Sequence, residues 1–153
     1  MDRRVFRPRI AVGGVPVHAM FVPFPIVCFT GALLTDLAYA ASAQVQWTNF
    51  SQWLLLFGTV FAGLAAVFGL IDYFSAPRER RPAIGLWHMA LNLVLFVVAA
   101  FNNLVHARDG WTSVVPTGLT LSIITMLLLT VSGHLGHRLA YRHVVRDLEE
   151  DRP

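Results

Sequence analysis

The chain has 153 residues, of which 56% are hydrophobic and 14% charged, and its formal net charge is +3. Soluble domains carry about a quarter charged residues, so this composition, with a mean hydropathy of +0.58, excludes an ordinary soluble domain and predicts an integral membrane protein. The single cysteine, Cys28, excludes an internal disulfide, a thiolate zinc site and covalent haem attachment, and we expect it to be a packing residue.

Four apolar runs are long enough to cross a bilayer as helices. They cover roughly Val17–Ala41, Trp53–Phe74, Ile84–Val105 and Val114–Leu135. The connections are short, so consecutive helices should be antiparallel neighbours. We therefore predict an all-α fold, an integral membrane four-helix up-down bundle that forms a single transmembrane domain over residues 1–153. The two tails are too short to fold alone.

The beginning of the chain also resembles a cleaved signal peptide, because arginines and an apolar run precede Ala-Tyr-Ala-Ala-Ser-Ala. The run is longer than the apolar part of a signal peptide, however, and it contains His18 and Asp36. We expect it to be retained as the first span.

All basic residues are arginines, and four spans would place every one except Arg108 on the same membrane side. The positive-inside rule makes that side cytoplasmic. We expect a multi-pass protein of the bacterial inner (cytoplasmic) membrane with both termini in the cytoplasm. The arginines then orient the chain in lipid, and no nucleic-acid partner is expected.

Polar residues form a stripe along the third span, from His88 through Asn92 and Asn102 to His106. His88 and His106 are 18 residues apart, which is five helical turns and about 27 Å. They share one face but lie at opposite surfaces of a membrane core about 30 Å thick. They should therefore belong to two sites.

The predicted topology sorts the other polar residues between the same two ends. His18, Asp72, His134 and His137 fall with His88 at the cytoplasmic end, and Asp36 and Arg108 fall with His106 at the other end. The second span adds a stripe of small residues, Gly58, Ala62, Ala65 and Gly69, which allows close helix approach or leaves room for a flat ligand.

Each of these residues also has a structural explanation. Asp36 and Arg108 could form an ion pair between the first and third spans, and Asp72 could cap the next segment or pair with Arg78. The asparagines Asn92 and Asn102 are typical interhelical hydrogen-bonding groups. His134 and His137 could be interfacial residues at a helix end or an i, i+3 pair of metal ligands.

Several segments resemble a family of bacterial four-span membrane proteins called domain of unknown function 2231. They are VPVHAMFVPFPI…GALLTDLAY (15–39), GTVFAGLAAVFGLIDYF (58–74), RRPAIGLWHMALNLVLF (80–96) and GHLGHRLAYRHVV (133–145). The resemblance carries over recurrent polar residues at His18, Asp36, Asp72, His88 and Arg108. The last segment departs from the family at its histidines, 134 and 137. Genes of the family commonly lie beside sugar or alcohol dehydrogenase genes, which hints at respiratory electron transfer.

Three functions are compatible with these residues. The first is a b-type haem-binding electron-transfer subunit with His18 and His88 as axial ligands, His134 or His137 as substitutes, and a membrane-associated dehydrogenase or larger respiratory-type complex as partner. The second is a non-catalytic accessory or scaffold subunit, and the third is a divalent metal site built on His18 and His88. We do not expect an enzyme by itself, since phosphate loops and nucleophile elbows are missing.

Overall fold

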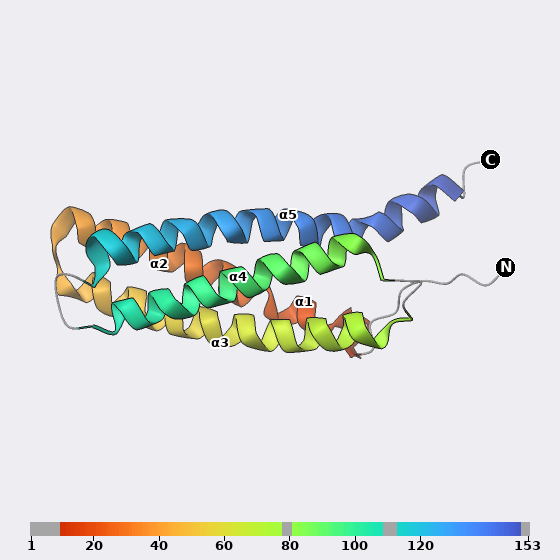
Figure 1. The fold of residues 1–153 in the computed structure, drawn as a ribbon, viewed down its shortest axis with the longest axis horizontal. Coiled ribbons are helices and arrows are strands. Elements are labelled where there is room, and N and C mark those ends of the chain that lie inside the picture. The colour runs from red at the N-terminus through yellow and green to blue at the C-terminus, as the bar shows by residue number, and fades with distance from the viewer. Residues whose placement is uncertain (1–9, 78–80, 109–112, 151–153) are drawn as a thin grey trace.

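The computed structural model describes residues 10–77, 81–108 and 113–150, with side chains as far as residue 141. Within these residues four helical segments are long and apolar enough to cross a membrane: Val17–Ser42, Val45–Ser75, Ala83–His106 and Val114–Tyr141. They run alternately up and down in one elongated bundle (Figure 1). The predicted all-α four-helix membrane bundle is confirmed.

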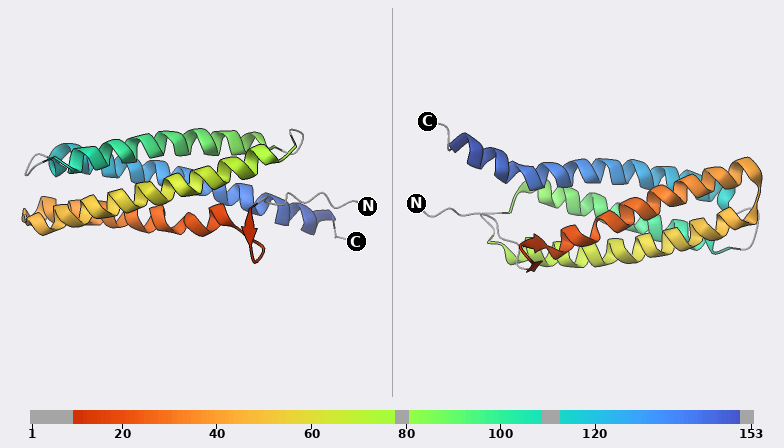
Figure 2. Two further views of the ribbon diagram at one scale, coloured as in Figure 1. Left: turned by 90° about the horizontal axis from the view of Figure 1, so that it is seen from below. Right: turned by 180° about the vertical axis from the view of Figure 1, so that it is seen from behind.

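The two ends of the bundle differ in what they carry. Four segments lie together at one end of the bundle, as all three views show (Figures 1 and 2). They are the start of the first span, the end of the second, the start of the third and the Arg138 region of the fourth. We call this the arginine-rich end and the other the opposite end. The location of the arginine-rich end in the cytoplasm stays a prediction.

A short hairpin precedes the first span. Strands β1 (Ala11–Val12) and β2 (Val15–Pro16) pair antiparallel, with Val12 opposite Val15. Gly13 and Gly14 connect them with φ of 58° and 82°. Two successive positive φ angles are what a two-residue hairpin turn of type I′ requires, and glycine adopts them without steric cost. This part of the tail is folded, because it packs onto a spanning helix.

The first span is divided into α1 (Val17–Phe21) and α2 (Pro23–Ser42). Proline has no backbone N–H, so Pro23 and Pro25 cannot donate the hydrogen bonds that would continue α1 into α2. The break separates α1, which packs mainly on α3, from the rest of the first span. It gives the position of His18 some independence from α2.

Two helices are longer than the apolar runs predicted for them. Helix α3 (Val45–Ser75) begins eight residues before the predicted Trp53, after a turn in which Ala43 has φ of 55°. Helix α5 (Leu119–Glu150) follows the short segment η2 (Val114–Gly118), which is kinked by the non-helical backbone of Val115, and continues beyond the apolar run predicted to end at Leu135. Hydropathy marks the stretch that lies in lipid, whereas helices continue into polar sequence wherever backbone hydrogen bonding allows. Helix α4 (Ala83–His106) matches its predicted span closely.

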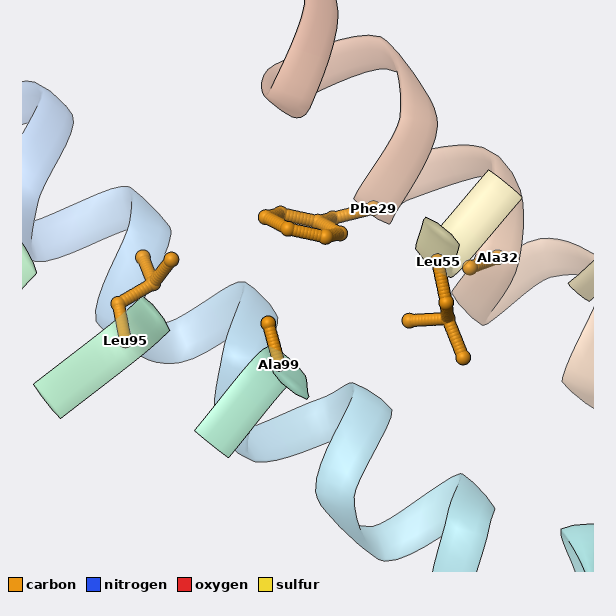
Figure 3. Packing of buried hydrophobic residues seen from close by; sticks show 5 residues of the cluster. All are labelled: Phe29, Ala32, Leu55, Leu95 and Ala99. Atoms are coloured by element: carbon orange, nitrogen blue, oxygen red, sulfur yellow. The ribbon is translucent and has the colours of Figure 1, made fainter. Parts of the chain in front are cut away.

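The helices pack around the bundle in the order α2, α3, α4, α5, so that α2 and α4 are diagonal to each other. Their core is small and apolar, and Figure 3 shows its members: Phe29, Ala32, Leu55, Leu95 and Ala99. The ring of Phe29 lies against Gly58, where a Cβ atom would be 2.6 Å from Cε1. Close approach at small residues is how membrane helices associate, because lipid removes the hydrophobic drive for packing.

The outer surface of the bundle is strongly apolar. Val27, Leu93, Leu104 and Leu127 are each more than 60% exposed. Contiguous exposed apolar surface of this extent is unfavourable in water and favourable in a bilayer. The packing therefore agrees with the composition.

Candidate functional site

His18 is held against the second span at the arginine-rich end. Its Nδ1 lies 2.6 Å from the main-chain oxygen of Ala65, and its ring rests on Gly69, where a Cβ atom would be 2.9 Å from Nδ1. A carbonyl oxygen can only accept, so Nδ1 carries the hydrogen. In the neutral ring the lone pair is then on Nε2.

His88 is held in the same way, but against α5. Its Nδ1 lies 3.1 Å from the main-chain oxygen of Ser132, and a Cβ atom on Gly136 would be 3.1 Å from Cε1. The amide nitrogen of Asn92 lies 3.2 Å from Nε2 and donates to the main-chain oxygen of His88 at 2.7 Å. Nδ1 is again the donor, and Nε2 accepts.

The two imidazoles belong to diagonal spans at the same end of the bundle. Each is half-buried and hydrogen-bonded to the helix beside it. Helix α1 packs on α3 and has no comparable packing with α4 or α5 among the described residues.

His134 and His137 are placed differently. Both are exposed, and the His137 ring packs on Tyr141 of its own helix with centroids 4.2 Å apart. The face of α5 that meets His88 presents Ser132 and Gly136 instead, and a 100° rotation per residue turns positions 134 and 137 away from it. The structure does not bring these two histidines to the pair formed by His18 and His88.

Asp72 holds the start of the hairpin by a hydrogen bond. Its Oδ1 accepts a hydrogen bond from the backbone N–H of Ile10 at 3.1 Å, and the residue is 8% exposed. Its expected partner Arg78 lies outside the described residues. The contact with Ile10 ties the hairpin to the end of α3, beside the turn that leads into α4.

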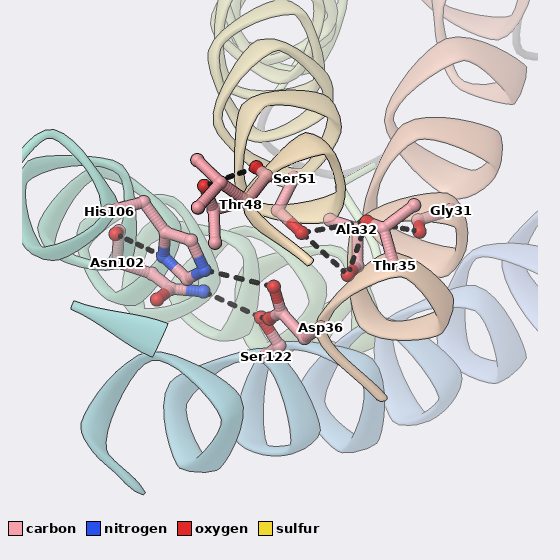
Figure 4. Close-up of polar contacts among 10 residues, drawn as sticks. Gly31, Ala32, Thr35, Asp36, Thr48, Ser51, Asn102, His106 and Ser122 are labelled. Atoms are coloured by element: carbon pink, nitrogen blue, oxygen red, sulfur yellow. Dashed lines mark hydrogen bonds and ion pairs between the residues drawn. The ribbon is translucent and has the colours of Figure 1, made fainter. Parts of the chain in front are cut away.

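A second polar cluster lies at the opposite end, buried between α2, α4 and α5 (Figure 4). Asp36 Oδ1 is 3.0 Å from His106 Nε2, and Asp36 Oδ2 accepts from Ser122 Oγ at 2.6 Å. Asn102 Nδ2 donates to Ser122 Oγ at 2.9 Å. All four residues are at most 4% exposed, so bulk water does not reach them.

This cluster corrects the predicted ion pair. Arg108 is exposed and makes no ion pair with Asp36, whose two oxygens are both used by His106 and Ser122. His106 faces the core. Arg108 follows it by two residues, which at 100° per residue is a rotation of about 200° about the helix axis, so Arg108 points away from the core. His88 and His106 have different partners, Ser132 for the former and Asp36 for the latter.

Sequence reasoning missed the hydroxyl groups of this end. Ser122 is central to the cluster, and a second, partly buried pair, Thr35 Oγ1 and Ser51 Oγ at 2.7 Å, joins α2 to α3 nearby. Serine and threonine are common in membrane helices and give a weak signal alone. The useful signal was Asp36, since an acid in an apolar span needs a donor at the same depth on a neighbouring helix.

Comparison with known proteins gives a family and no activity. A family model described as "Predicted membrane protein (DUF2231)" matches residues 14–149, which is most of the chain. No curated protein and no solved structure matches it.

Proposed function

The chain belongs to the DUF2231 family of predicted membrane proteins, and from this premise we propose that it is a b-type haem-binding electron-transfer subunit with His18 and His88 as axial ligands. The family description supplies the membrane setting. The two imidazoles at the arginine-rich end supply the chemical argument.

The observation that carries the proposal is the tautomer that both rings adopt. Each histidine donates Nδ1–H to a main-chain oxygen of a neighbouring helix, Ala65 for His18 and Ser132 for His88. Histidines that ligate metals almost always donate their other ring N–H to such a second group, which fixes the ring and raises the basicity of the ligating nitrogen. Both Nε2 atoms therefore have the electronic state of a ligand.

The donor set distinguishes haem from a closed divalent metal site. A structural zinc site needs four protein ligands, and a catalytic one needs three. The described residues contain no group of three or more His, Cys, Asp or Glu side chains that could hold a metal ion. A haem iron needs only axial ligands from the protein, and two imidazoles from facing helices satisfy it. The residues present fit haem better than zinc.

The surroundings of the two rings assign further roles. Gly69 and Gly136 let each imidazole lie flat against a helix, and a methyl group at either position would crowd the ring. Asn92 Nδ2 lies 3.2 Å from His88 Nε2, so the Asn92 side chain would have to turn away before this nitrogen could hold an iron atom. Arg138 is exposed at this end and supplies a cation for haem propionates. A bound haem would supply reversible one-electron transfer at its iron.

A scaffold function is the competing proposal, and the hydrogen bonding of both polar clusters favours it. The contacts from His18 to Ala65, from His88 to Ser132 and from Asp36 to His106 each join two helices, and they would strengthen a purely structural bundle. In that case the helical extension of α5 beyond Leu135 would be the surface that meets a larger membrane complex. Under the haem proposal the same extension meets a membrane-associated dehydrogenase.

The absorption spectrum of the purified full-length protein, expressed with haem supplied, separates the two. We expect a Soret band and the sharp visible bands of a low-spin, six-coordinate haem in the reduced protein. His18→Ala and His88→Ala should each abolish them. His134→Ala and His137→Ala are matched controls, since both imidazoles are exposed on other faces of α5, and they should leave the spectrum unchanged.

Either of two results refutes the haem proposal. One is a protein that remains colourless after reconstitution with haem. The other is a haem spectrum that survives both His18→Ala and His88→Ala, which would place the ligands elsewhere. A colourless protein that co-purifies with a stoichiometric membrane partner would establish the scaffold function.

A further inference from the structure

The buried cluster at the opposite end constrains where hydrogens can lie. His106 Nδ1 is 3.0 Å from the main-chain oxygen of Asn102, and His106 Nε2 is 3.0 Å from Asp36 Oδ1. Neither the carbonyl nor an ionised carboxylate can donate, so both ring nitrogens face acceptors. If Nδ1 carries a hydrogen, a second hydrogen must lie between Nε2 and Oδ1.

The other carboxylate oxygen of Asp36 is the acceptor of a hydrogen bond from Ser122. Asn102 Nδ2 is a donor only, so it directs its hydrogen to Ser122 Oγ at 2.9 Å. The Ser122 hydroxyl hydrogen is then free to point at Asp36 Oδ2, 2.6 Å away. Oδ2 therefore accepts, and the proton that Asp36 and His106 share is confined to the contact between Oδ1 and Nε2.

The surroundings favour keeping this proton. The side chains of Asp36 and His106 are both 0% exposed. With the proton the pair is neutral overall, whether it is written as imidazolium and carboxylate or as imidazole and carboxylic acid. Without it a single negative charge would be buried at the level of the bilayer, which is strongly unfavourable.

The neighbouring groups do not supply another positive charge that could replace the shared proton. Among the described residues, α3 contributes the hydroxyl of Ser51 nearby, η2 contributes Gly118 against the imidazole, and α2 contributes the buried phenol of Tyr39 one turn after Asp36. Arg108, the nearest described cation along α4, is exposed. Asp109 lies outside the described residues.

One atom of the cluster points to a ligand. Asn102 Oδ1 is buried in a residue with 0% exposure, and it has no hydrogen-bond partner among the described residues. Buried carbonyl oxygens are nearly always satisfied, often by an ordered water molecule. His106 is the last residue of α4, so the cluster lies within about a turn of the end of this helix.

We propose that Asp36 and His106 form a proton-binding site, with a water molecule on Asn102 Oδ1 as its route to the nearby surface. The pair holds one proton between Oδ1 and Nε2. On release, the proton passes to water as hydronium and leaves a carboxylate beside a neutral imidazole. This site needs no cofactor and is independent of the haem proposal.

Two spectroscopic measurements on the full-length protein in lipid nanodiscs at neutral pH test this. Nitrogen NMR of ¹⁵N-histidine-labelled protein, assigned by the signal lost in His106→Gln, reports the protonation of both ring nitrogens. Infrared difference spectra against Asp36→Asn report a protonated carboxyl group. Asp72→Asn is the matched control, because it removes a carboxylate at the other end of the bundle.

We expect either a doubly protonated His106 or a protonated Asp36, with the signal moving to its deuterated position after transfer to D₂O. A neutral His106 beside an ionised Asp36 overturns the shared proton. A shared proton that does not exchange with D₂O overturns the water route. If Asp36→Asn does not fold, ¹³C-aspartate labelling of the unsubstituted protein identifies the carboxyl band without it.

Discussion

Removing the imidazole of His106 should destabilise the protein far more than the loss of an ordinary hydrogen bond. Interhelical hydrogen bonds in membrane bundles contribute only about 0.6 kcal/mol on average. The contact between Asp36 and His106 is different, because both side chains are 0% exposed and His106→Ala leaves an acid without its partner. Breaking a buried ion pair by removing one partner costs about 3–5 kcal/mol, and we expect a loss in that range.

A double-mutant cycle distinguishes the orphaned charge from simple loss of packing. Asp36→Asn keeps the shape of the side chain and can donate to His106 Nε2, so it should cost about 1–2 kcal/mol. In the double variant no charge is stranded, and it should be more stable than His106→Ala alone by about 2 kcal/mol. The free energy of unfolding in mixed SDS and detergent micelles measures all four corners. Additive losses, or a loss below about 1 kcal/mol for His106→Ala, would refute the argument.

Two further outcomes are expected. Gly58→Ala places a Cβ atom 2.6 Å from the Phe29 ring and should cost about 1–3 kcal/mol of unfolding free energy, whereas Gly133→Ala, with nothing within 4 Å, should change it by less than about 0.5 kcal/mol. Gly69→Ala should displace the imidazole that rests on it and weaken haem retention in a transfer assay to apomyoglobin, and unchanged retention would contradict the proposed role of Gly69.

Hydropathy predicted the spans better than the helices. The third span agreed closely because Pro82 precedes it and polar residues follow it, so the helix and the apolar run end together. Helices α3 and α5 extend well past their apolar runs, and no change in hydropathy marks the start of α3 at Val45. The break at Val22 was visible as Pro23 and Pro25, whose missing N–H groups interrupt a helix in any environment.

The two polar ends illustrate what spacing alone can and cannot decide. The number of residues between His88 and His106 was enough to place them at opposite ends of the span, since the rise per residue of an α-helix is constant. The partner of Asp36 depended on which face of α4 turns inward, because His106 and Arg108 point in nearly opposite directions. Ser122 belongs to α5, and the packing of α5 against α2 determines that its hydroxyl lies at the level of Asp36.

The sequence by itself determined a four-span membrane bundle with polar residues gathered at two levels, because apolar length and helical periodicity are local properties of the chain. Only the tertiary structure decided which polar atoms meet: His18 with Ala65, His88 with Ser132, and Asp36 with His106. Helix rotation and axial offset select these pairs. Both depend on how small residues such as Gly58 and Gly136 let neighbouring helices and side chains approach.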